Sequence, residues 1–255
     1  MKPTFLIDCF AENGLNCGTE YAVVAIDVIR ATTVAITAAA NGWRCFPVSS
    51  LEAAQQAAAR CPNPLLMGEL AGEMPDWFEM NNSPAELEAR TDRHRPIVLL
   101  SSNGTKLIAD AKSRAVTYLA SLQNFRAAAH ELVGKHERIA IIGAGSRGEF
   151  REEDQMCCAW IGEILLQHGY LPKDRSTAEM ISKWSGAPAS AFISSKSVDY
   201  LRRTDQLQDL DYILAHVDDL RFAYVMDAGE VIELGRSSVT AIDTTRSAPI
   251  ITKVA

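Results

Sequence analysis

The sequence lacks the features that mark membrane, secreted or nucleic-acid-binding proteins. No stretch approaches the roughly 20 consecutive apolar residues of a membrane-spanning helix, and the first apolar run, at residues 5–7, is far too short for a signal sequence. Basic residues are in deficit, with 25 Lys and Arg against 32 Asp and Glu and a formal net charge of −7. This balance argues against nucleic acid as the main partner. We therefore expect a cytoplasmic protein that binds neither a membrane nor a nucleic acid.

Cysteine is present without the spacing that binds structural zinc. The six cysteines include no Cys-x-x-Cys pair, and no histidines are paired at zinc-binding spacing. No cysteine is followed six positions later by arginine, which disfavours a cysteine phosphatase. We expect free thiols. The cysteines are Cys9, Cys17, Cys45, Cys61, Cys157 and Cys158.

Short apolar runs alternate along the chain with helical periodicity, which favours a mainly parallel sheet with helices on both faces, a three-layer α/β/α fold. Strands are predicted at residues 5–7, 22–26, 45–48, 65–67, 97–100, 116–119, 139–142, 222–225 and 231–234. Helices are predicted at residues 31–40, 50–60, 104–111, 122–133, 152–168, 176–183 and 205–217. We expect one unit over residues 1–255, with two α/β lobes, 1–135 and 136–255, as the alternative. The tail after residue 236 is predicted to be irregular.

The segment 26–33 carries the most informative pattern. A β-branched strand stops at Asp27 and is followed by Arg30 and the hydroxyls of Thr32 and Thr33. In an open α/β sheet, ligands collect at the carboxyl ends of strands, where the next helix also directs its positive N-terminal end. This edge suits a metal and an anion together. An ion pair on a turn, with Thr32 or Thr33 as a helix cap, is the alternative.

Two further strands end in polar groups. The strand at 65–67 leads into Glu69, with Asn82 and Ser83 downstream as either caps or ligand donors. The strand at 97–100 opens into small polar residues that suit a phosphate cradle, because glycine permits close backbone approach and N–H groups and hydroxyls donate to oxygens. A plain turn with a serine cap is the alternative. The cradle residues are Ser102, Asn103, Gly104 and Thr105.

A fourth edge, at residues 141–148, matches Gly-x-Gly-x-x-Gly after a strand. A dinucleotide site requires a second strand that ends in an acid about 20 residues later, and here a long helix follows instead. A nicotinamide-dependent oxidoreductase is therefore the least favoured alternative. Asp154 on that helix offers a carboxylate to a metal, and Arg147 offers a cation to an anion.

Taken together, the four edges predict a magnesium site. Asp27, Glu69 and Asp154 supply carboxylates, and Arg30 and Arg147 supply cations. Mg²⁺ takes oxygen ligands and is usually held by one or two carboxylates plus substrate phosphate oxygens. The residue two positions after Asp27 is not an acid, so the aspartyl-phosphate phosphatase motif is absent.

These motifs, in this order over roughly residues 20–165, resemble the 2-phosphosulfolactate phosphatase family. The resemblance rests on the segments 26–33, 68–69, 82–84, 102–105, 121–124, 145–148 and 153–154. It implies a Mg²⁺-dependent acid phosphatase of α/β/α fold that acts on 2-phospho-3-sulfolactate in the route to coenzyme M, or on related 2-hydroxycarboxylic acid phosphates. The chain departs from the family where Leu70 replaces the usual arginine and Ser101-Ser102 replaces two threonines.

The expected mechanism follows from these residues. Asp27, with Glu69 or Asp154, is predicted to hold Mg²⁺ against the phosphate of a small anionic substrate, while Arg30 and Arg147 neutralise its oxygens. A spare carboxylate would orient water as general base. The competing hypothesis is a non-catalytic phosphate-binding module or sensor, which Leu70 keeps open. A homo-oligomer, with a homodimer as one option, is expected because most soluble oligomers are homo-oligomers.

Overall fold

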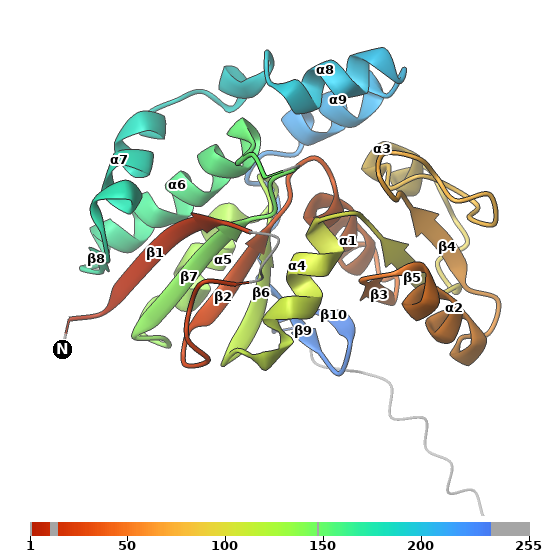
Figure 1. The fold of residues 1–255 in the computed structure, drawn as a ribbon, viewed down its shortest axis with the longest axis horizontal. Helices are drawn as coiled ribbons and strands as arrows, with labels where there is room; N and C mark the ends of the chain where they lie inside the picture. The colour runs from red at the N-terminus through yellow and green to blue at the C-terminus, as the bar shows by residue number, and fades with distance from the viewer. Residues whose placement is uncertain (1, 11–14, 147, 236–255) are drawn as a thin grey trace, which may run out of the picture.

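The computed structural model describes residues 2–10, 15–146 and 148–235, and its strands form two separate sheets (Figure 1). In the larger, seven-stranded sheet the order is β10-β9-β6-β2-β7-β1-β8. Neighbours from β6 to β8 run parallel, whereas β9 runs antiparallel to both β6 and β10. Its strands are β1 (Thr4–Cys9), β2 (Ala22–Ile26), β6 (Val116–Ala120), β7 (Arg138–Gly143), β8 (Leu171–Pro172), β9 (Tyr224–Asp227) and β10 (Glu230–Glu233).

The smaller sheet has three parallel strands in the order β3-β5-β4. They are β3 (Cys45–Val48), β4 (Leu65–Gly68) and β5 (Ile97–Leu100). The chain leaves the larger sheet after β2, builds this small sheet and returns at β6. Helix α1 (Ala31–Ala40) lies between the two sheets, and this position explains why its residues 31–39 are all buried.

Helices cover both faces of the larger sheet. One face packs against α5 (Phe125–Leu132), α6 (Glu152–Gln167) and α7 (Arg175–Trp184). The other packs against α1 and α4 (Gly104–Asp110). The remaining helices are α2 (Leu51–Arg60) on the small sheet, and α3 (Pro84–Glu88), α8 (Lys196–Arg203) and α9 (Leu207–Ala215), which lie together at one end of the molecule.

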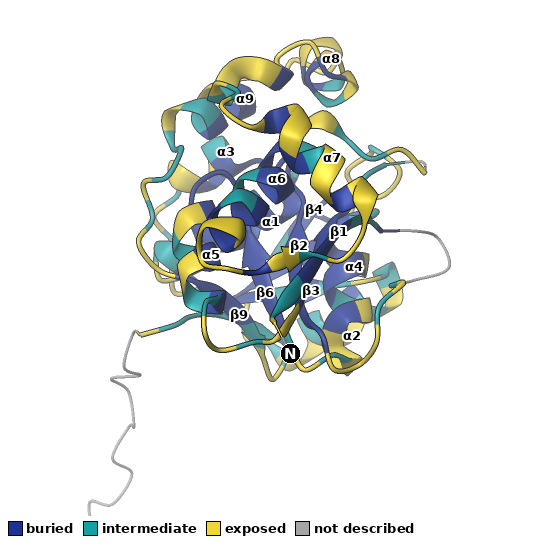
Figure 2. Cartoon of the chain, turned by 90° about the vertical axis from the view of Figure 1, so that its left-hand side faces the viewer, coloured by how far each residue is buried: buried dark blue, intermediate teal, exposed yellow. Residues whose placement is uncertain are grey.

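Strand β2 shows how the sequence builds two cores from one strand. Val24 and Ile26 point into the core beneath α5 and α6, whereas Val23 and Ala25 point into the core beneath α1. All four are fully buried, and each such aliphatic side chain larger than alanine stabilises the fold by about 1.5–3 kcal/mol. Figure 2 shows the resulting buried centre with exposed residues on the outer helices.

The structure confirms the three-layer, mainly parallel fold, and each predicted strand is present within two residues of its expected bounds. The helix predicted from residue 122 begins at Phe125, because Asn124 Oδ1 accepts from the Ser121 amide at 3.0 Å and holds a turn. Helices α3 and α8 and strand β8 were not predicted, since each is short.

The predicted division into lobes at residue 135 stays a prediction. In the larger sheet β7, from beyond that position, lies between β1 and β2. Residues 236–255, predicted to be irregular, lie outside the described part of the chain. None of the helices in the described residues could span a membrane.

Candidate active site

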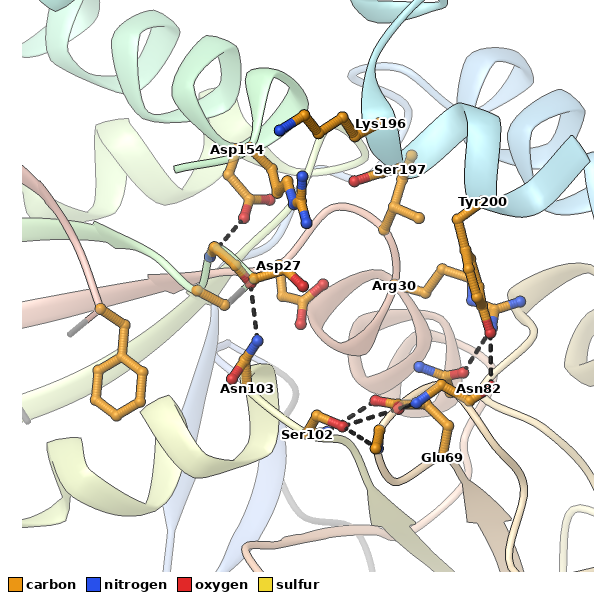
Figure 3. Close-up of a pocket in the computed structure, with 18 of the residues that line it drawn as sticks. Asp27, Arg30, Glu69, Asn82, Ser102, Asn103, Asp154, Lys196, Ser197 and Tyr200 are labelled. Carbon is orange, nitrogen blue, oxygen red and sulfur yellow. Dashed lines mark hydrogen bonds between the residues drawn. The ribbon is translucent and has the colours of Figure 1, made fainter. Parts of the chain in front are cut away.

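A cavity of about 1020 Å³ lies where the turns after β2, β4, β5 and β7 meet α8 (Figure 3). Parallel strands place their carboxyl ends at the same edge, so residues far apart in sequence converge here. The predicted site residues that line the cavity are Asp27, Arg30, Glu69, Asn82, Ser102, Asn103 and Asp154. The structure therefore brings together carboxylates from three of the four predicted edges.

Asp27 lies at the centre of the group in Figure 3 and is only 8% exposed. Burial raises the pKa of its carboxyl from 3.8 to about 7. The Ala31 backbone N–H donates to the carboxylate and opposes this shift, whereas the charges of Glu69 and Glu153 add to it. Asp27 thus combines access to the cavity with a poorly compensated negative charge.

The turn at Gly104 packs directly against Asp27. A Cβ atom at this position would lie 2.2 Å from Asp27 Oδ2 and 2.5 Å from the Ala31 side chain, so only glycine fits. Beside it, Asn103 Nδ2 donates to the Gly145 carbonyl at 3.1 Å and joins the β5 and β7 turns. The glycine predicted as part of a phosphate cradle thus shapes the wall behind the carboxylate.

Asp154 joins the β2 and β7 turns to the start of α6. Its Oδ1 accepts from the Val28 amide at 2.9 Å, and its Oδ2 accepts from the Gly145 amide at 3.2 Å. Burial, followed by the charges of Asp27 and Glu153, raises its pKa well above 3.8. Neighbouring Glu153 is buried, and its Oε2 has no hydrogen-bond partner among the described residues.

Arg30 lines the cavity, but other side chains occupy its guanidinium group. Nη1 donates to Gln206 and forms a buried ion pair with Asp209, while Nη2 donates to Asn82 Oδ1 at 2.8 Å. The Ile29–Arg30 peptide bond is cis. Arg30 and Asn82 thus hold each other and fasten α9 to the turn before α3.

Glu69 is held by its own loop and by the β5 turn. Its Oε1 accepts from the Ser102 amide at 2.8 Å, and its Oε2 accepts from the Ser102 hydroxyl at 2.9 Å and the Gly72 amide at 2.7 Å. The Tyr200 hydroxyl on α8 donates to the Gly72 carbonyl at 2.7 Å. These bonds fix the cavity wall that contains Leu70, which is 41% exposed.

The remaining predicted ligands lie behind the cavity wall, where they hold backbone. Thr32 Oγ1 accepts from the Asp27 amide at 2.9 Å, and Thr33 Oγ1 donates to the Val28 carbonyl at 2.8 Å. Ser83 caps α3 and donates to Asp209. Thr105 Oγ1 accepts from the Ser101 amide at 2.9 Å. These contacts agree with the alternative given in the sequence analysis, in which such residues cap helices and form turns and bind no ligand.

Arg147 lies outside the described residues, so its predicted contact with an anion stays a prediction. The glycines around it have a structural explanation, because a Cβ on Gly145 would lie 2.6 Å from both Cys9 Sγ and the Glu149 carbonyl oxygen. The Ser146 and Glu149 backbones pair in a turn. The Gly-x-Gly-x-x-Gly pattern thus follows from close packing and turn formation.

Sequence reasoning missed several side chains that line the cavity. They are Lys106, Arg151, Lys196, Ser197, Arg202, Arg203 and Tyr200. Most come from α8, whose signals were the Ser195 cap and the apolar spacing of Val198 and Leu201. Asp209, the buried partner of Arg30, was also missed.

Comparison with known proteins assigns the chain to a family. The family model described as 2-phosphosulpholactate phosphatase matches residues 11–227. The chain belongs to the 2-phosphosulpholactate phosphatase family. Every cavity-lining residue of the β2, β4, β5 and β7 turns and of α8 lies within the matched range.

Several proteins named "Probable 2-phosphosulfolactate phosphatase" are similar to the chain. One from Pseudothermotoga lettingae is 34% identical over 143 residues, which is 56% of this chain and 61% of the relative. One from Symbiobacterium thermophilum is 38% identical over 145 residues, 56% of this chain and 62% of the relative. One from Clostridium perfringens is 27% identical over 220 residues, 83% of this chain and 89% of the relative. The chain thus matches about three fifths of the length of the first two relatives.

Proposed function

We propose that the protein is a phosphatase that hydrolyses the phosphate ester of a 2-hydroxycarboxylic acid, 2-phospho-3-sulfolactate or a related compound, with the help of Mg²⁺. The names of the relatives support phosphatase activity. The observation that carries the proposal is that two buried carboxylates, Asp27 and Asp154, line the same cavity as several cations, among them Lys106, Lys196, Arg202 and Arg203. Carboxylates that hold a metal, with cations around them, are suited to a phosphate monoester.

The donor set fits Mg²⁺ at Asp27 and Asp154. The charge of Asp27 adds to burial in raising the pKa of Asp154, and a divalent cation would relieve the repulsion between the two carboxylates. Among the described residues, no three or more His, Cys, Asp or Glu side chains are placed together to hold a metal. Mg²⁺ tolerates this because it keeps waters and takes substrate oxygens as ligands. The oxygens of both Asp154 and Glu69 also accept hydrogen bonds from the chain, those of Asp154 from two backbone amides and those of Glu69 from Ser102 and Gly72.

Each group in the cavity has a separate role in the proposed hydrolysis. Bound Mg²⁺ would neutralise charge on the phosphate oxygens, which is the main requirement of phosphoryl transfer. The cations that α8 contributes to the cavity, Lys196, Arg202 and Arg203, attract the anionic ester against the net charge of the whole chain. We propose that water attacks phosphorus while the bond from phosphorus to the ester oxygen breaks, that Glu69 accepts a proton from the attacking water, and that the leaving oxygen takes a proton from solvent to give the hydroxy acid.

Phosphate release tests the proposal. We expect purified protein to release phosphate repeatedly from 2-phospho-3-sulfolactate or 2-phospholactate with Mg²⁺, and to stop when a chelator removes the metal. The competing function is a phosphate-binding sensor, which the uncharged, exposed Leu70 in the cavity wall favours. Saturable binding of these esters without release of phosphate would establish the sensor and contradict the phosphatase.

A further inference from the structure

The cations around the cavity differ in whether a carboxylate neutralises them. The cationic side chains of the lining are Arg30, Lys106, Arg151, Lys196, Arg202 and Arg203. The pairs with carboxylates are Arg30–Asp209, Arg151–Glu149, Lys196–Glu149 and Arg202–Asp199. Among the described residues, Lys106 and Arg203 have no carboxylate partner, so both present uncompensated charge to the cavity.

Lys106 differs from Arg203 in one further respect. Arg203 Nε donates to the Asp199 carbonyl at 3.2 Å, whereas the Lys106 ammonium makes no hydrogen bond within the part of the chain that the structure describes. Lys106 also lies two residues after Gly104, whose Cα packs against the Asp27 carboxylate. Because Lys106 and Asp27 line the same cavity, an anion bound by Lys106 would share that cavity with the group held at Asp27.

The loop after β4 offers no cation to the cavity. The loop after β4 contributes Leu70, Ala71 and Gly72 to the cavity. A second anionic group of a ligand would thus find its counter-charge on α4 or α8.

We propose that Lys106 is a specificity-determining residue that binds a second anionic group of the substrate, a carboxylate or a sulfonate. The inference rests on the proposed function, which places the phosphate ester at Asp27. In the phosphate ester of a 2-hydroxy acid, the carboxylate is attached to the carbon that bears the ester oxygen, so the two anionic groups lie close together. The lysine ammonium, a point charge on a flexible stem, accommodates either oxyanion.

Four phosphate esters and three variants test this role. Ethyl phosphate carries no second anion, 2-phospholactate carries a carboxylate, 2-sulfoethyl phosphate carries a sulfonate, and 2-phospho-3-sulfolactate carries both. We expect Lys106→Met to raise KM about tenfold or more for esters with the bound group, as expected for loss of a charged hydrogen bond. The KM for ethyl phosphate and the kcat values should change little. Lys106→Arg should restore the preference, because it keeps the charge.

The matched control is Lys112→Met, since Lys112 is exposed and lies outside the cavity; it should leave all four KM values unchanged. A selective effect on 2-phospholactate assigns the carboxylate, and one on 2-sulfoethyl phosphate assigns the sulfonate. Equal effects on all four esters, or none on any, would overturn the inference.

If the proposed function is wrong, the wild type will release no phosphate from any of the four esters, a result distinct from failure of the Lys106 inference. Calorimetric binding of 2-phospholactate then decides the role of Lys106. Weaker binding by Lys106→Met than by Lys112→Met would support it. Equal binding, or no binding by the wild type, would contradict it.

Discussion

At the scale of single residues, the proposed chemistry depends most on Asp27. Its carboxyl is buried among other acids, and the backbone N–H of Ala31 compensates it only in part. Groups of this kind cluster at functional sites, because the same burial that perturbs their pKa strengthens their interaction with a bound ion or substrate. The fold tolerates this carboxylate at a cost in stability.

The pH dependence of stability tests this cost. Because the pKa of Asp27 in the folded protein is raised to about 7 from 3.8, the folded state binds its proton more tightly than the unfolded state. Its contribution to stability is therefore present below about pH 4 and is lost as the pH rises through 7. We expect Asp27→Asn to raise Tm at pH 8 by about 3 °C or more over the wild type in chelator, with a smaller gap at pH 5.

Asp110→Asn is the control, because Asp110 is exposed at the end of α4 and lies outside the cavity. Thermal unfolding measured by circular dichroism at both pH values gives the comparison. If the Tm difference between Asp27→Asn and the wild type is the same at pH 5 and pH 8, the raised pKa assigned to Asp27 is contradicted.

A second prediction concerns the buried pair of Arg30 and Asp209, whose side chains are 3% and 0% exposed. Asp209→Ala leaves the Arg30 guanidinium buried without its counter-charge, and we expect it to reduce the free energy of unfolding by about 3 kcal/mol or more. Glu179→Ala breaks the exposed pair with Arg175 and should change stability by less than about 1 kcal/mol. Urea denaturation measures the free energy of unfolding of both variants. Equal losses would contradict the prediction that the buried pair contributes more to stability than the exposed pair.

At the scale of elements, the turn between β5 and α4 positions the Asp27 carboxylate. Gly104→Ala introduces a Cβ that would lie 2.2 Å from Asp27 Oδ2, so either the carboxylate or the start of α4 must move. We expect this variant to lose at least about 100-fold in kcat/KM, because small displacements in an active site are costly. Gly134→Ala is a stringent control, since Gly134 has a positive φ of 75° but no atom within 4 Å of a built Cβ. It should lose stability and keep activity.

The sequence predicted the positions of the turns after β2, β4 and β5 better than it predicted the contacts that the side chains of these turns make. Each of Asp27, Glu69 and Ser102 follows a strand, and this placement was enough to bring them to one edge. The sequence did not reveal that Arg30 is neutralised by Asp209, 179 residues away. Such a partner depends on how α9 packs, and no local pattern encodes it.

Helix α8 shows why cations of the cavity were missed. With only eight residues it has little periodicity to detect, and its charged residues Lys196, Arg202 and Arg203 resemble an ordinary solvated face. Only the packing of α8 over the β4 loop, through Tyr200 and Gly72, places these cations at the cavity.

At the scale of the whole molecule, the cavity requires both sheets. The β2 and β7 turns of the larger sheet contribute Asp27 and the glycine-rich wall, whereas β4 and β5 of the smaller sheet contribute Glu69 and Ser102. The small sheet could not be separated from the large one by sequence, because its strands show the same apolar runs. The predicted homodimer, cytoplasmic location and lack of a nucleic-acid partner stay predictions.

The most direct test of the account is release of inorganic phosphate from 2-phospho-3-sulfolactate and 2-phospholactate by wild type and Asp27→Asn, each with Mg²⁺ and with chelator. We expect multiple turnovers only for the wild type with Mg²⁺, and a loss of at least about 1,000-fold for the variant, which corresponds to about 4 kcal/mol of transition-state stabilisation. The same Tm measurements show that the variant is folded. Turnover by folded Asp27→Asn at the wild-type rate, or wild-type turnover that is unaffected by chelator, would contradict the proposed site.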